Sequence, residues 1–183
     1  FTLIYPLMKY QGKLKSGFLW WLSKSVVMYP VSIIMAVVMV ITLHLFNNFS
    51  PVEFTKTILV ACITSVSFIS IMYFFNVLIG KIGSFIMLIF MVVQLAGSSG
   101  TYPIELSGSF VSKIHKWMPF SYTVKAFRST ISGSGSIRHY TLVLMSLTLI
   151  FVVLTIGLFE FRTYRIQKEK SNIYEFLEVN GLA

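Results

Sequence analysis

The sequence predicts an all-α membrane protein, a polytopic bundle whose helices cross the bilayer several times. Of its 183 residues, 56% are hydrophobic and only 11% are charged, which leaves too little polar surface to cover a soluble globule of this size. Several apolar runs approach or reach the roughly 20 residues that a helix needs to cross a bilayer. The charged residues flank these runs and are absent from their middles.

Four apolar segments are the predicted spans. The first, 26–46, carries Pro30 in its first turns, where a missing N–H group is tolerated. The second, 57–79, is again of full length. The third, 82–96, is short, because such a helix rises only about 22 Å against a hydrocarbon core of roughly 30 Å. The fourth, 140–159, is the last complete span.

The predicted bundle extends over 1–160 and includes two further features, a partial helix at its beginning and a hairpin between the second and third spans. The opening residues 1–8, "FTLIYPLM", are typical of the end of another apolar helix, so we expect the chain to be a fragment of a longer protein. Between the second and third spans, Gly80 and Gly83 flank a lysine, which favours a tight hairpin over one long helix. The consecutive spans are therefore expected to run antiparallel.

The basic residues predict the orientation. Nine of the fifteen lie before the first full span, in the hairpin or after the last span. Since basic residues concentrate on the cytoplasmic side of membrane proteins, these regions are predicted to be cytoplasmic, with the C-terminus inside. The net charge of +9 then reflects contact with membrane lipid and not nucleic-acid binding, since no soluble basic domain is present.

A conspicuous break follows the third span. The stretch "GSSGTYPIE", 97–105, places two glycines, a proline and a glutamate where a membrane helix would continue. Beyond it, apolar residues recur at helical spacing over about 104–131, with Pro119 between two amphipathic segments. We expect an outer re-entrant elbow followed by a pair of amphipathic helices, with the rings of Tyr102 and Trp117 at the outer interface.

The tail, 161–183, is predicted to be cytoplasmic. Asn172 and Glu175 have the spacing of a capping box, and Gly181 is a stop signal, so a short separate amphipathic helix is expected at about 172–180.

The sequence offers no catalytic constellation. The spans lack ionisable residues at membrane depth, which ion-coupled transporters usually keep. Their neutral polar residues favour helix packing over a substrate path. The one cysteine, Cys62, and the three scattered histidines give no metal-ligand set, and "GSSG" lacks the lysine of a phosphate-binding loop. We therefore predict a protein that is not an enzyme and has no cofactor.

A basic and aromatic stretch before the first span has two interpretations. Its lysines and tryptophans suit membrane anchoring, as an aromatic belt beside positive-inside charge. The same residues could instead form a cytoplasmic elbow on which an ATPase pushes. They are Lys9, Lys13, Lys15, Trp20, Trp21 and Lys24.

The stretch 94–133 resembles the hallmark region of the YhgE/Pip (phage infection protein) family. In that family an apolar helix ends in a Gly/Ser run, followed by Thr-Tyr/Phe-Pro-hydrophobic-Glu and later by a Pro-hydrophobic-Ser/Thr-Tyr element. The matching residues are Gly97, Gly100, Thr101, Tyr102, Pro103, Glu105, Pro119, Tyr122 and Arg128. None of them has a catalytic role in the family.

The resemblance implies a membrane domain like that of type-2 ABC exporters, with six membrane helices in the whole protein and a large extracellular region after the first. This chain would be the part that follows that region, in a bacterial cell membrane. Three roles stay open: a dimeric, non-enzymatic platform that anchors the extracellular region, as in phage receptors; the EsaA/YueB-like component of type VII secretion; and an exporter half driven by a separate ATPase.

Overall fold

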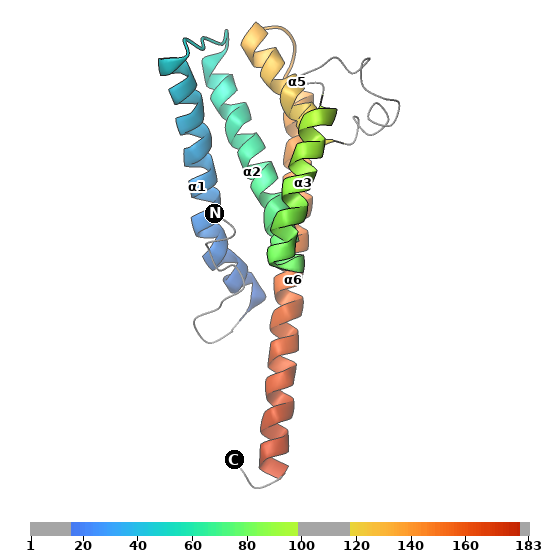
Figure 1. Ribbon diagram of the computed structural model, residues 1–183. Helices are drawn as coiled ribbons and strands as arrows, with labels where there is room; N and C mark the ends of the chain where they lie inside the picture. Colours follow the sequence, from blue (N-terminus) through green and yellow to red (C-terminus); the bar gives the residue numbers. More distant parts are fainter. Residues whose placement is uncertain (1–15, 99–117, 180–183) are drawn as a thin grey trace.

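The described part of the chain is a helical bundle. The computed structural model describes residues 16–98 and 118–179, which contain helices and no strands, so the predicted all-α class is confirmed. The helices are α1 (Gly17–Phe46), α2 (Phe54–Ile79), α3 (Lys81–Gly97), α5 (Pro119–Ser132) and α6 (Arg138–Val179). Figure 1 shows α1, α2 and α6 as the body of the bundle, with α3 against α2 and α5 at one end.

The two ends of the bundle differ. We call the "tail end" the one where α1 begins, α2 meets α3 and α6 projects beyond the other helices (Figure 1). The "α5 end" is the opposite one, where α1 joins α2 and α5 leads into α6.

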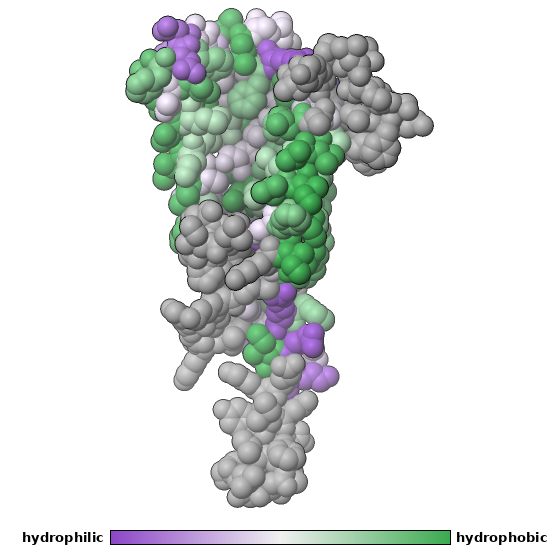
Figure 2. All heavy atoms as spheres, in the orientation of Figure 1, coloured by the Kyte–Doolittle hydropathy of each residue, from purple (hydrophilic) through white to green (hydrophobic). Residues whose placement is uncertain are grey.

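Three helices are long and apolar enough to cross a membrane: α1, α2 and the Arg138–Lys168 part of α6. At 30 residues, α1 rises about 45 Å, more than the hydrocarbon core requires. Figure 2 shows the apolar surface of the spans, with hydrophilic residues gathered at the α5 end and along α6 below the bundle. Large side chains such as Met35 and Leu149 point outward, as expected for a protein embedded in lipid.

Helix α1 begins at Gly17, upstream of the predicted start at 26. Nothing between Ser16 and 26 breaks a helix, and the Ser16 hydroxyl accepts a hydrogen bond from the Phe18 N–H at 3.2 Å, which is an N-cap. Two expectations change with this earlier start. Pro30 lies in the helix interior instead of the first turns, and Trp20 is buried in the core instead of exposed at the interface.

A glycine separates α2 from α3. Gly80 has φ 70°, a conformation that favours glycine, and its N–H donates to the Asn76 carbonyl at 2.8 Å. The 17 residues of α3 rise only about 25 Å, so this helix is shorter than a full span. The close contact of α2 and α3 is made by Gly83, where an added Cβ would collide with the Phe75 carbonyl group.

Helix α2 is the centre of the packing, because it contacts α1, α3, α5 and α6. Hydroxyl groups join it to its neighbours. Ser65 donates to the Ser32 carbonyl of α1 at 2.8 Å. Ser67 donates to the Leu144 carbonyl of α6 at 3.0 Å and also lies 2.8 Å from the Thr148 hydroxyl. The small polar residues of the spans therefore hold helices together, as such residues do in membrane proteins.

The tail differs from the prediction. Helix α6 runs without interruption from Arg138 to Val179, so no separate helix begins at about 172 in the described residues. No Gly or Pro occurs between 158 and 179, and the glutamates and lysines of this stretch are good helix formers. Asn172 therefore lies within a continuing helix and does not start a new one.

The glycine contacts give a matched test of the packing. Gly17→Ala and Gly83→Ala should each lower the free energy of unfolding by about 1–3 kcal/mol, because the added Cβ collides with a neighbouring backbone. Gly157→Ala in α6 meets no atom within 4 Å and should stabilise the protein by about 0.5–1 kcal/mol. Denaturant titration in detergent micelles measures all three. Equal effects at the three sites would contradict the described helix contacts.

Candidate functional site: the helix-end clamp and the start of α5

A carboxylate from α6 lies at the beginning of α1. Glu160 Oε1 accepts hydrogen bonds from the Phe18 N–H at 2.9 Å and from the Ser16 hydroxyl at 3.2 Å. The first turn of α1 contains no acidic residue of its own. Because the N-terminus of a helix carries a partial positive charge and unsatisfied N–H groups, Glu160 supplies the charge that this helix end favours.

An arginine from the same region of α6 lies at the end of α2. Arg162 Nη2 donates to the Val77 carbonyl at 2.5 Å and approaches the Leu78 carbonyl at 3.5 Å. The last turn of α2 contains no basic residue. Since the C-terminus of a helix carries a partial negative charge, Arg162 complements α2 as Glu160 complements α1.

We name this arrangement the helix-end clamp. It consists of Ser16, Gly17 and Phe18 of α1, Val77 and Leu78 of α2, and Glu160 and Arg162 of α6. At Gly17 the α1 and α6 backbones approach so closely that an added Cβ would lie 2.5 Å from the Glu160 nitrogen. A buried aromatic core lies beside it, in which Trp20 and Tyr73 each meet the Phe159 ring edge to face. The clamp and this core fix the tail end of three helices relative to one another.

The second polar feature is the start of α5. Gln94 of α3 is fully buried, and its Oε1 accepts the Phe120 N–H at 3.1 Å. Pro119 occupies the first turn of α5, where its missing N–H costs nothing. An unsatisfied backbone N–H is costly inside a membrane, so Gln94 allows α5 to begin within the protein, below the α5 end.

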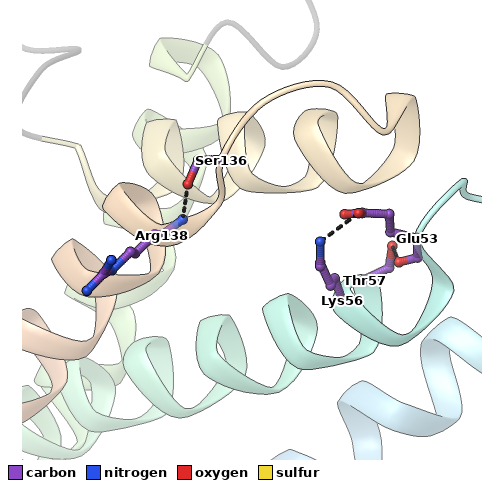
Figure 3. Close-up of polar contacts among 5 residues, drawn as sticks. All are labelled: Glu53, Lys56, Thr57, Ser136 and Arg138. Carbon is purple, nitrogen blue, oxygen red and sulfur yellow. Dashed lines mark hydrogen bonds and ion pairs between the residues drawn. The ribbon is translucent and has the colours of Figure 1, made fainter.

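The far end of α5 is joined to the loop between α1 and α2. The N–H groups of Val52 and Glu53 donate to the carbonyls of Ile131 and Thr130 at 3.2 and 3.1 Å. Gly133 then turns the chain with φ 66° against the Val52 side chain. Figure 3 shows Glu53 at the start of α2, where it binds Lys56 at 2.6 Å, and Ser136, whose hydroxyl accepts the Arg138 N–H at the start of α6.

The predicted family-motif residues are brought together only in part. Gly97 is buried at the end of α3, and Pro119 is buried at the start of α5. Tyr122 lies beside His139 of α6, with ring centroids 6.4 Å apart, and Arg128 is exposed on α5. The remaining residues of the predicted elbow lie outside the described residues; they are Gly100, Thr101, Tyr102, Pro103 and Glu105.

The predicted basic elbow before the first span is likewise divided. Lys9, Lys13 and Lys15 lie outside the described residues. Trp20, Trp21 and Lys24 belong to α1, with Trp20 in the core and Trp21 packed against it. In the described ranges, 16–98 and 118–179, no group of three or more His, Cys, Asp or Glu side chains could hold a metal ion.

The two charged residues of the clamp were not singled out from the sequence as a site. Their signal is weak but present: Glu160 follows directly on the last apolar run, and Arg162 comes two residues later. Gln94 is one of the neutral polar residues of the predicted spans, for which packing is expected, but its role in capping α5 depends on a contact with Phe120, 26 positions away.

These observations describe a helical membrane protein with short extramembrane connections in its described part, and comparisons place it in a family. Residues 15–159 match the ABC-2 transporter protein family. The chain belongs to this family.

One curated relative is similar over most of the chain. The chain is 32% identical over 160 residues to "Uncharacterized protein YhgE" of Bacillus subtilis (strain 168), an alignment that covers 86% of this chain and 21% of YhgE. The resemblance to a YhgE/Pip-like membrane domain is thereby confirmed. The chain spans about a fifth of the length of this relative. No solved structure matches the chain.

The helix-end clamp predicts that the stability of the protein depends on the charge of Glu160 and not on the size of its side chain. Glu160→Gln keeps the shape of the side chain but removes its charge, so it should lower the free energy of unfolding by about 0.5–1 kcal/mol. Lys56→Gln is the control, because it removes one charge from the exposed Glu53–Lys56 pair, which contributes less. Denaturant titration at low and at high salt checks both variants, and the Glu160 effect should shrink as salt screens it. A larger loss of stability in Lys56→Gln than in Glu160→Gln would contradict the clamp.

The hydrogen bond from the Phe120 N–H to Gln94 predicts that a change at Gln94 loosens α5 and leaves α1 as it is. Gln94→Leu leaves the Phe120 N–H buried without an acceptor, a loss of about 1–3 kcal/mol. The amides of α5 should then exchange with deuterium faster, while those of α1 between Met28 and Val40 stay as protected as before. Unchanged exchange in α5, measured by mass spectrometry in micelles, would show that Gln94 does not hold this helix.

Proposed function

We propose that the chain is the membrane part of a larger protein and serves as a non-enzymatic platform of the YhgE/Pip type. The observation that carries this proposal is the fixation of α1, α2 and α6 at the tail end, through the helix-end clamp and the aromatic core beside it. The α5 end is held as well, by the backbone bonds between α5 and the α1–α2 loop. A bundle held at both ends is suited to anchoring a further part of the protein.

The length of the relative supports an anchoring role. Four fifths of YhgE lie outside the aligned region, so a protein of this type has much more chain to hold than these helices alone. By the family resemblance that chain is a large extracellular region, which would lie on the side of the α5 end. Phage binding and type VII secretion are the two roles that the resemblance offers to such a region.

We place the tail end in the cytoplasm of a bacterial cell. The charge distribution supports this orientation, because nine of the fifteen basic residues lie at that end or in the segments connected to it. Among them, Arg162 lies in the clamp, and Arg165 and Lys168 follow it on α6.

We further propose that two copies pair through α3. An apolar stripe on this helix is exposed at Phe85, Leu88 and Val92, by 60–64% of each side chain. These positions recur at helical spacing and form one face, opposite Gly83 and Met87, which pack against the bundle. A helix with one buried and one exposed apolar face suits contact with a second membrane helix.

Pairing is tested by cysteine crosslinking in the full-length protein with its other cysteines replaced. Phe85→Cys should give a disulfide-linked dimer on mild oxidation in native membranes. Val38→Cys is the control, since Val38 is similarly exposed on the lipid face of α1 and should give none. Monomers with both variants would contradict pairing through α3.

An exporter half driven by a separate ATPase is the second candidate, and the family match favours it. ABC-2 family membrane domains work with an ATPase, and the tail end, where α6 projects, offers such a partner a surface. Affinity purification after crosslinking in the native membrane separates the two proposals. The platform predicts no stoichiometric ATPase. The exporter predicts an ABC ATPase whose hydrolysis is altered by Glu160→Ala, a change in the clamp that connects α6 to α1.

A further inference from the structure

A cleft lies between α1, α2 and α5 in the half of the bundle nearer the α5 end. Its volume is about 620 Å³. The residues that line it include Met35 and Met39 of α1, Thr64 of α2, and Phe120, Val124 and Phe127 of α5. We propose that this cleft binds one acyl chain of a membrane lipid from the leaflet at the α5 end, a property that does not depend on the function proposed above.

The cleft opens sideways, toward the lipid. Met35 and Met39 are 69% and 52% exposed and form its α1 edge. Both lie on a helix that is long and apolar enough to cross a membrane, so the space beyond them is occupied by lipid chains. At the opposite side the cleft is closed by small residues, because Ala36 and Ala61 are buried where α1 and α2 meet.

The walls suit an apolar guest. Two of the hydroxyls that line the cleft bind the protein itself: Ser65 donates to the Ser32 carbonyl, and Thr123 donates to the Pro119 carbonyl. Thr64 Oγ1 is the one buried hydroxyl oxygen of this lining, within the described residues, that has no hydrogen-bond partner. A buried water needs two to four polar partners, so one hydroxyl does not hold water here, and a hydrated or charged ligand is excluded.

The size of the cleft favours a lipid chain over a protein helix. A helix with its side chains is about 10 Å across and rises about 5.4 Å per turn, so a volume of this size holds only about one and a half turns. A single acyl chain is narrower and fits as an extended piece. It also restores the dispersion contacts that the aromatic and methionine side chains would lack beside an empty space.

The test uses the full-length protein in phosphatidylcholine vesicles that contain a phosphatidylcholine with a photoreactive diazirine on one acyl chain. Irradiation and peptide mapping locate the labelled residues. We expect labels on Thr64 and Phe127, which line the cleft and are less exposed than its methionine edge. Val124→Trp fills the cleft and should abolish this labelling, whereas Val38→Trp, the same substitution on the exposed lipid face of α1, should leave it unchanged.

Two outcomes would overturn the proposal. Equal labelling of these residues in the wild type and in Val124→Trp would mean that the label reports general lipid contact. Absence of labelling in the wild type, with Met39→Cys forming a disulfide to a second copy or to another segment of the protein, would mean that protein covers the cleft. If Val124→Trp fails to elute as a folded species, Thr64→Leu fills the same space from α2, and the same loss of labelling is required.

Discussion

Every helix ends with backbone groups that no other residue of that helix satisfies, and the arrangement of this bundle depends on how two such ends are satisfied together. Glu160 and Arg162, two residues apart on α6, meet the positive beginning of α1 and the negative end of α2. Neither helix has a complementary charge of its own in that turn. Because one short piece of α6 provides both charges, the three helices cannot slide independently at the tail end. The close approach at Gly17 then sets how near α1 and α6 lie.

The same constraint explains how a short helix is accommodated at the other end of the bundle. Backbone groups inside a membrane must find partners within the protein. Helix α5 begins at depth because Gln94 accepts its first free N–H, and it ends where its carbonyls bind the loop between α1 and α2. The cleft lined by α1, α2 and α5 is a consequence of this placement, since α5 packs beside the two spans without filling the space between them.

Much of this architecture could be predicted from sequence because membrane spans have a strong composition signal. The fold class follows from long apolar runs, and the break between α2 and α3 follows from the two glycines that flank a lysine, the first of which, Gly80, has a positive φ in the structure. The start of α1 could not be predicted in the same way. Hydropathy fades before Val26, but the helix continues back to a cap at Ser16 that depends on Glu160 of a distant helix.

Contacts between distant helices were the least accessible from sequence. Trp20 is typical of an interfacial anchor when it is considered alone, and only the packing of α6 against α1 makes it a core residue beside Phe159. Likewise the capping signal at Asn172 is a local pattern that the good helix formers around it override in α6. The motif residues between Gly97 and Pro119 lie largely outside the described residues, so their role in the elbow stays a prediction.

The most direct test of this account is to exchange the two charges of the clamp. The double variant Glu160→Arg with Arg162→Glu keeps the composition and net charge of the protein but turns each charge against the helix end that it faces. If the clamp holds the bundle, the double variant unfolds at lower denaturant than the wild type, and amides in the first turn of α1 lose protection from hydrogen exchange. A double variant with the stability and exchange pattern of the wild type would contradict the account.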